Sequence, residues 1–305
     1  MNSGGVTPAP NWAGHDLSES DMRWYDLSHA DLSGTTLRSV MAARVTMREV
    51  TAPGAIFDES DLSAADFRSG CLTRASLVAC DLEGALLCGC DLSDANLEGA
   101  NLQRANLAGA KLRGANLIGA NLCRANLAAA DVTGAVLDGA DLSHADAPGA
   151  DFSQASLIGT RLRLADLSDV TLSHARVLGT VFERASLLRA RLIDLAAHQA
   201  VFEFADLRQT KLDRVDCFQA NCVGASFDGA EAVDCSFEEA DFYWVDMANW
   251  LARRCNFRGA RMPAAVEIVY GPKGVEPETV PVLPLYRTAA TPAQRRQLQQ
   301  HLLSS

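Results

Sequence analysis

Serine, histidine and aspartate stand close together twice in this chain, in the sequence SHAD at Ser28–Asp31 and again at Ser143–Asp146. These are the residue types of a hydrolytic triad, in which a histidine activates the serine oxygen and a carboxylate orients the histidine. A triad also needs a pocket that holds the substrate beside the nucleophile. The chemistry therefore depends on the elements that carry the two motifs.

Both motifs lie in a repeat with a period of five residues. The repeat is clearest from Asp91 to Ala130, where leucine recurs at every fifth position, with alanine two residues before most leucines and Asn or Asp one residue before. Five residues advance an α-helix by about 140°, which would spread the leucines around the whole helix. A flat strand would place them on alternating faces. The leucines share one interior only if each pentapeptide turns the chain by a quarter.

Four quarter turns make one coil, and stacked coils joined by strand-like hydrogen bonds form a square-sided β-helix. The register runs without a slip from Leu17 to Met262, which is about 50 pentapeptides, about 12 coils and a rod about 60 Å long at the spacing of β-strands. In each pentapeptide the leucine (called the centre below) and the residue two before it point inward. The SHAD motifs then occupy ordinary repeat positions on an exposed surface without a pocket, so we expect no catalysis.

The pattern Ala-(Asp/Asn)-Leu-x-x resembles the pentapeptide repeat family, and the resemblance covers residues 15–264. It implies an all-β fold, a right-handed quadrilateral parallel β-helix. The best-known members are quinolone-resistance and mycobacterial proteins that resemble DNA in shape and charge and bind DNA gyrase. Members that protect gyrase from quinolones usually carry loops that interrupt the repeat. This chain has no such loop in its repeat and is more similar to the loop-free members.

We expect three segments: an N-terminal lead-in or cap at residues 1–14, the β-helix at residues 15–264, and a C-terminal tail at residues 265–305. Trp12 is expected to cover the open end of the first coil, because a solenoid must shield its terminal core. In the tail, the sequence predicts a short strand at residues 266–270, a Pro-rich connection at residues 271–284 and a short helix at residues 293–303. The helix is interpreted either as a cap over the last coil or as the contact of a homodimer.

Composition and charge exclude several classes of function. The net charge is −11, and an acidic rod should repel phosphates, so we expect no direct binding of nucleic acid. The 6 His are dispersed and the 9 Cys lack CxxC spacing, so no metal site and no cofactor are expected. The first residues show neither a basic start nor an apolar run, and no apolar stretch of about 18 residues occurs, which predicts a cytoplasmic protein without a membrane segment.

Some inward positions hold unusual residues. Most cysteines stand at inward positions, where Cys acts as a small apolar side chain. Cys235 and Cys255 are one coil apart, close enough to form a disulfide, although reduced thiols are the expected state. Trp250 stands at an inward position that is too small for it, so it should either distort the last coil or swing out toward the tail.

An apolar surface in the C-terminal half predicts a protein contact, because exposed aromatic clusters are typical of binding sites. One outward column, with residues one coil apart, contains two aromatic residues and leaves a gap at Gly224 between them. The candidate partner-binding residues on and beside this column are Leu164, Phe204, Phe218, Tyr243 and Trp244. The leading hypothesis is a non-enzymatic protein–protein interaction scaffold or adaptor that uses this surface.

The charge distribution supports an alternative partner. Two opposite faces of the rod, those that begin at Leu17 and Leu27, carry an excess of acidic residues. One column of the Leu27 face contains the candidate DNA-mimic residues Asp146, Asp166, Asp206 and Asp246. The rod has only about one third of the charge density of DNA, which carries about one charge per 1.7 Å. The alternative is therefore a DNA-mimicking binder of a topoisomerase such as DNA gyrase, which would give quinolone resistance or self-protection.

Overall fold

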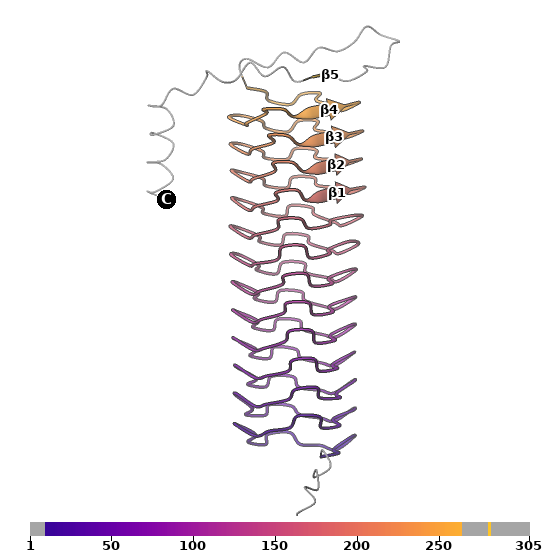
Figure 1. Cartoon of the computed structure of the whole chain (residues 1–305), viewed down its shortest axis with the longest axis vertical. Coiled ribbons are helices and arrows are strands. Elements are labelled where there is room, and N and C mark those ends of the chain that lie inside the picture. The colour runs from indigo at the N-terminus through magenta and orange to yellow at the C-terminus, as the bar shows by residue number, and fades with distance from the viewer. Residues whose placement is uncertain (1–9, 264–279, 282–305) are drawn as a thin grey trace, which may run out of the picture.

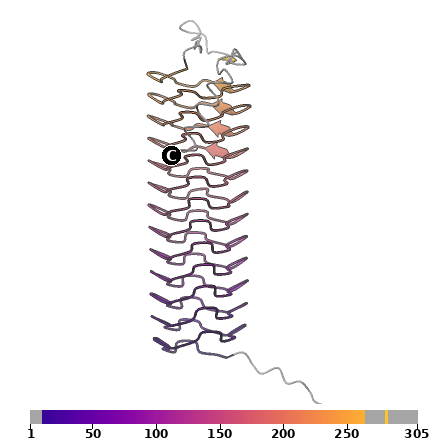
Figure 2. The same cartoon turned by 90° about the vertical axis from the view of Figure 1, so that its left-hand side faces the viewer.

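The computed structural model describes residues 10–263 and 280–281. Over residues 10–263 the chain winds into a straight rod of stacked coils, with the N-terminal coil at the bottom of Figure 1 and the C-terminal coil at the top. Figure 2 shows the same regular stack from the side. The fold class that the repeat predicts, a parallel β-helix, is confirmed.

Backbone hydrogen bonds in parallel register join each coil to the next. The paired residues are 20 apart, from Asn11 with Asp31 at one end of the rod to Asp241 with Arg261 at the other. Because every coil uses the same number of residues, a given outward position stacks directly above its equivalent in the coil before. Columns of side chains therefore run along the whole rod.

Four paired segments are long enough to be strands, and they lie in successive coils near the C-terminal end (Figure 1). They are β1 (Arg191–Ile193), β2 (Lys211–Asp213), β3 (Glu231–Val233) and β4 (Leu251–Arg253), paired in parallel in that order. A fifth strand, β5 (Val280–Pro281), pairs antiparallel with β4. β5 falls within the predicted Pro-rich connection. The predicted strand at 266–270 and helix at 293–303 lie outside the described residues.

Most corners of the coil are tight turns closed by a hydrogen bond. Ala100 N–H donates to the carbonyl of Leu97 at 3.0 Å, and Gly99 between them has a φ of 63°. A positive φ at the third residue is the geometry of a type II turn, which glycine adopts at no steric cost. Other residues also occupy this position, such as Arg104 with a φ of 58°, and each carries about 1–2 kcal/mol of strain. The stacking of the coils must offset that strain.

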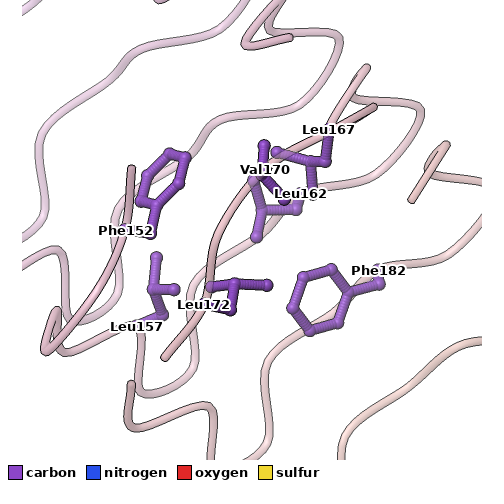
Figure 3. A pocket seen from close by; sticks show the side chains of 7 residues that line it. All are labelled: Phe152, Leu157, Leu162, Leu167, Val170, Leu172 and Phe182. Carbon is purple, nitrogen blue, oxygen red and sulfur yellow. The ribbon is translucent and has the colours of Figure 1, made fainter. Parts of the chain in front are cut away.

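One continuous apolar core fills the rod. The centre Leu102 and the inward Ala100 are both 0 % exposed. Figure 3 shows a small apolar gap in this core and the side chains around it. They are Phe152, Leu157, Leu162, Leu167, Val170, Leu172 and Phe182. The gap is too small to hold a water molecule, so it offers no site for a substrate.

Trp250 stays inside the rod, so the alternative in which it swings out toward the tail is wrong. It is 1 % exposed and stacks on Phe227 with ring centroids 4.9 Å apart. Phe237 packs edge-on against the indole at 5.6 Å. Val245 and Cys255, which take inward positions in the same region, are only partly buried. The indole is therefore accommodated among the aromatic residues of the core near this end of the rod.

At the other end of the rod, Trp12 belongs to the hydrogen-bond ladder. Its N–H donates to the carbonyl of Asp31 at 2.8 Å, and its side chain packs against the core. Trp12 therefore acts as a centre of the first coil, and the bonded coils begin before residue 15.

Of three pairs of asparagines stacked in adjacent coils of the regular repeat, two form amide ladders. Asn116 Nδ2 donates to Asn96 Oδ1 at 3.0 Å, and Asn121 Nδ2 donates to Asn101 Oδ1 at 3.2 Å. The third pair, residues 106 and 126, is joined through the backbone bridge. Its amide oxygens accept from backbone N–H groups two residues further on, as those of the other two pairs also do.

One outward carboxylate is nearly buried and is held by two arginines. Asp66 is 8 % exposed. Its Oδ1 accepts from Arg68 Nε at 2.9 Å, and its Oδ2 accepts from Arg48 Nε at 2.6 Å. The Arg68 hydrogen bonds, opposed by burial and assisted by Arg48, lower the pKa of Asp66 from 3.8 to about 2.

We expect Leu102→Ala to lower the free energy of unfolding by about 2–5 kcal/mol, because it leaves a cavity in a fully packed interior. Cys90→Ala is the matched control, since alanine is the usual residue at that inward position, and it should cost less than about 1.5 kcal/mol. Urea unfolding followed by circular dichroism measures both. A Leu102→Ala cost as small as that of the control would contradict the packing described here.

We expect Asp66→Asn to remove part of the acid sensitivity of the fold. The folded pKa of Asp66 lies below its unfolded value, so its stabilisation is present above about pH 4 and is lost as the pH falls toward about 2. Allowing for solvent screening, the loss is on the order of 1 kcal/mol. Urea unfolding at pH 5 and pH 2.5 measures it: the variant should lose less stability than the parent protein. Equal losses would show that Asp66 is not the group responsible.

Candidate partner-binding surfaces

The structure does not assemble a triad from the first SHAD motif. Ser28 Oγ donates to Asp26 Oδ1 at 2.6 Å, not to a histidine. His29 stands at an exposed corner, with its Nδ1 3.4 Å from a carboxylate oxygen of Glu49 in the next coil. Asp31 Oδ1 accepts from the backbone and hydroxyl groups of Ser33. Each polar group thus has a local partner of its own.

The second motif has the same layout. Ser143 N–H donates to Asp141 Oδ1 at 2.9 Å, and His144 and Asp146 are exposed. Within the described coils no group of three or more His, Cys, Asp or Glu residues is arranged to hold a metal ion. The described part of the chain also contains no helix that is long and apolar enough to cross a membrane.

The candidate partner surface is built around Trp244, whose residue is 56 % exposed. The indole stacks on the Tyr243 ring, with centroids 4.6 Å apart and the planes inclined by 28°. The Arg261 guanidinium lies 4.3 Å from the centroid of the Tyr243 ring and also reaches Asp241 at 3.1 Å. Trp244 therefore lies on a platform of fixed side chains, which limits the rotamers it can adopt.

Phe204 lies in the same column as Trp244, two coils earlier, and its ring extends over Gly224 between them. A Cβ at Gly224 would come within 2.4 Å of the Phe204 ring, so only glycine fits beneath it. The predicted gap at Gly224 is therefore filled, and the expectation of an open slot between the aromatic residues is wrong. On its other side, the Phe204 ring centroid is 5.9 Å from the Arg184 guanidinium carbon.

Leu164 and Phe218 lie apart from this cluster. Leu164 is exposed two coils before Phe204 in the same column, with Arg184 between them. Phe218 lies in another column and packs edge-on against His198 at 6.0 Å. His198 Nε2 is in turn 2.7 Å from Asp216 Oδ2. Of the five candidate residues, only Tyr243 and Trp244 are in contact with each other. Phe204 lies two coils before Trp244 in the same column and is half-buried, with its ring over Gly224.

A second exposed aromatic pair near the N-terminal end was not predicted as a site. Trp24 is 68 % exposed, and the Arg44 guanidinium lies 4.8 Å from its ring centroid. Tyr25 beside it is also exposed, although its position is inward elsewhere in the repeat. The 20-residue spacing places Trp24 in the column of Trp244, so counting along the whole column in the sequence could have found it.

The four candidate DNA-mimic aspartates, Asp146, Asp166, Asp206 and Asp246, differ in whether a basic side chain pairs with them. Asp146 and Asp166 are bridged in adjacent coils, and neither forms an ion pair with Lys or Arg in the described coils. Asp206 is different, because Arg208 Nη2 binds its Oδ2 at 2.6 Å. Partial burial acts to raise the pKa of Asp206, but the Arg208 hydrogen bonds lower it below its usual value. Asp246 Oδ2 accepts from Ser226 Oγ at 3.4 Å.

The family model described as "Pentapeptide repeats" matches residues 80–117, 100–139, 135–173, 165–203 and 210–249. No curated protein matches the chain.

Two solved structures illustrate the likeness. HetL, a pentapeptide repeat protein involved in heterocyst differentiation regulation from the cyanobacterium Nostoc sp. strain PCC 7120, is 26% identical with a TM-score of 0.41, over 84% of this chain and 90% of HetL. QnrB1, a plasmid-mediated fluoroquinolone resistance protein, is 20% identical with a TM-score of 0.30, over 75% of this chain and 92% of QnrB1.

The family model covers more than half of the chain, and the matched residues lie within the coils that the structure shows. The resemblance that the Ala-(Asp/Asn)-Leu-x-x pattern indicates is confirmed, and the fold is the right-handed quadrilateral β-helix that it implies. The chain belongs to the pentapeptide repeat family.

Proposed function

We propose that this chain is a non-enzymatic scaffold that captures a protein partner through the surface formed by Phe204, Tyr243 and Trp244. The observation that carries the proposal is the exposed indole of Trp244, stacked on Tyr243. Leaving a tryptophan in water is unfavourable, and tryptophan and tyrosine are over-represented among the residues that dominate binding energy.

The surface is prepared for binding because its side chains are already ordered. Tyr243 N–H donates to Asp241 Oδ1 at 2.9 Å, and the Arg261 guanidinium covers the tyrosine ring. The Phe204 ring is held between Arg184 and Gly224. A partner would therefore lose little additional conformational freedom of this surface on binding, which favours affinity. The platform is apolar with a rim of charged groups, which suits a partner that presents an apolar side chain between polar ones.

We expect Trp244→Ala combined with Phe204→Ala to weaken partner binding by at least about 30-fold, the effect of removing a 2 kcal/mol contact. Trp24→Ala is the matched control, because it removes another exposed tryptophan from the other end of the same column. The measurement is a pull-down with the full chain, followed by titration of the recovered partner. Capture that is unchanged in the double variant, with circular dichroism showing intact folding, would rule out this surface.

The second candidate function is a DNA-mimicking binder of DNA gyrase. Asp146 and Asp166 favour it, because they stack in adjacent coils and neither forms a salt bridge with Lys or Arg in the described coils. Successive phosphates likewise follow one another along a DNA strand. The Arg208 pair at Asp206 weakens it, since it removes one charge from the same column. QnrB1, one of the similar structures, is itself a fluoroquinolone resistance protein.

If the acidic column binds gyrase, the purified protein should inhibit supercoiling or relieve quinolone inhibition at micromolar concentration or below. Reversing the charge of Asp146 and Asp166 to Lys should weaken the effect by tenfold or more, and added salt should weaken it further. The Trp244→Ala and Phe204→Ala double variant should behave like the parent protein in this assay. An effect that survives the charge reversal, or no effect at all, would remove this candidate.

A further inference from the structure

Cys235 and Cys255 are the only two cysteines of the chain that are 20 residues apart, and they occupy the same inward position in successive coils. They follow β3 and β4 by two residues, where the backbone ladder continues with Asn256 N–H donating to the carbonyl of Cys235 at 2.9 Å. Neighbouring strands lie about 4.8 Å apart. That spacing falls within the range of about 4.4–6.8 Å that separates the Cα atoms of disulfide-bonded cysteines.

The two thiols differ in exposure. Cys235 is buried, whereas Cys255 is only partly buried, in the last coil of the parallel stack that the structure describes. Both sulfurs contact backbone carbonyls, and the two thiols interact with each other. The contact with Cys255, together with burial, raises the pKa of Cys235, and the same contact lowers the pKa of Cys255. The more exposed sulfur is thus the one that more readily becomes a thiolate, the form that reacts with oxidants.

The other cysteines lack this arrangement. Burial raises the pKa of Cys80 to about 12 and raises that of Cys222 as well. Cys217 is fully enclosed and its pKa is also raised by burial. These thiols are therefore protonated and screened from solvent at neutral pH, so they should react slowly with any oxidant.

We propose that Cys235 and Cys255 form a reversible disulfide when the protein meets a hydroperoxide, with Cys255 as the attacking thiolate and Cys235 as the resolving thiol. The Cys255 sulfur attacks one peroxide oxygen and the O–O bond breaks, which leaves a sulfenic acid on Cys255 and, after protonation, releases water from hydrogen peroxide. The Cys235 sulfur then attacks the sulfenic sulfur as its S–H proton leaves. The S–O bond breaks and a second water departs. The two thiols supply the two electrons that reduce the peroxide.

The disulfide would close a loop that contains Tyr243, Trp244 and Trp250. It would join the coil of β3 to the coil of β4, the last one in the parallel stack of the described residues. The terminal coils of a repeat protein open most easily, because they have fewer stacked neighbours. The cross-link would therefore suppress local opening at this end of the rod. Any effect on partner capture rests on the proposed function, but formation of the disulfide does not.

The test begins with oxidation of the full-length protein by hydrogen peroxide, followed by digestion with trypsin and Asp-N under non-reducing conditions. Mass spectrometry should find residues 234–240 joined to residues 255–258, and dithiothreitol should separate them. In Cys235→Ala the link should be absent, and dimedone should label a sulfenic acid on Cys255. Cys217→Ala is the matched control and should keep the link. Alanine is the usual inward residue, so the Cys235→Ala variant should fold.

Amide hydrogen exchange then tests whether the disulfide suppresses local opening of the last described coil. Oxidation should slow amide exchange in residues 241–250 by about tenfold, with no change in Cys235→Ala. A link through Cys217 or Cys222, or unmodified Cys255 after treatment, would overturn the proposed pair. If the Cys235–Cys255 disulfide forms but amide exchange in residues 241–250 is unchanged, the proposed suppression of local opening is wrong. Failure of the Trp244 surface to bind a partner changes none of these readouts, so the two proposals fail separately.

Discussion

Every coil of the rod is bonded to the next by backbone hydrogen bonds between residues 20 apart, and the other features of the molecule depend on that ladder. It requires four turns per coil, each with a residue at positive φ, and it leaves an interior wide enough for one centre and one small residue per pentapeptide. Residues such as Arg104 accept the strained conformation because the two neighbouring coils fix their backbone. The strain at the corners and the uniformity of the core thus both follow from the hydrogen-bond ladder between the coils.

The same ladder gives each outward residue two fixed neighbours, one coil before and one coil after. Where these neighbours match, they form amide ladders such as Asn96 with Asn116. Where they do not, one side chain must adapt to the other: Phe204 lies over Gly224, and Arg44 packs on Trp24. The surface is therefore determined column by column.

The period of five was enough to predict the coil, the register and the inward positions, because a single geometry satisfies that spacing over so many repeats. The exceptions depended on contacts between bulky side chains, which the repeat does not encode. Trp250 is retained inside because Phe227 stacks on it and Phe237 packs edge-on against it, and Gly224 is covered because the Phe204 ring turns toward it. The positions of Leu164, Phe204 and Trp244 in one column and of Phe218 in another were predictable from the register. The contacts of the Phe204 ring with Arg184 and of Phe218 with His198 were not.

The constant coil length also determines what insertions and deletions of repeats do to the molecule during evolution. Duplication or deletion of a whole coil keeps every column in line and alters the separation of Trp24 and Trp244 in steps of about 4.8 Å. Gain or loss of a single pentapeptide keeps the core intact but rotates everything beyond it by a quarter turn, which would carry Trp244 to a neighbouring face. The number of whole coils between two sites thus sets the distance between them along the rod. The number of additional pentapeptides sets the face on which the second site lies. Both can vary while the inward residues keep the same packing.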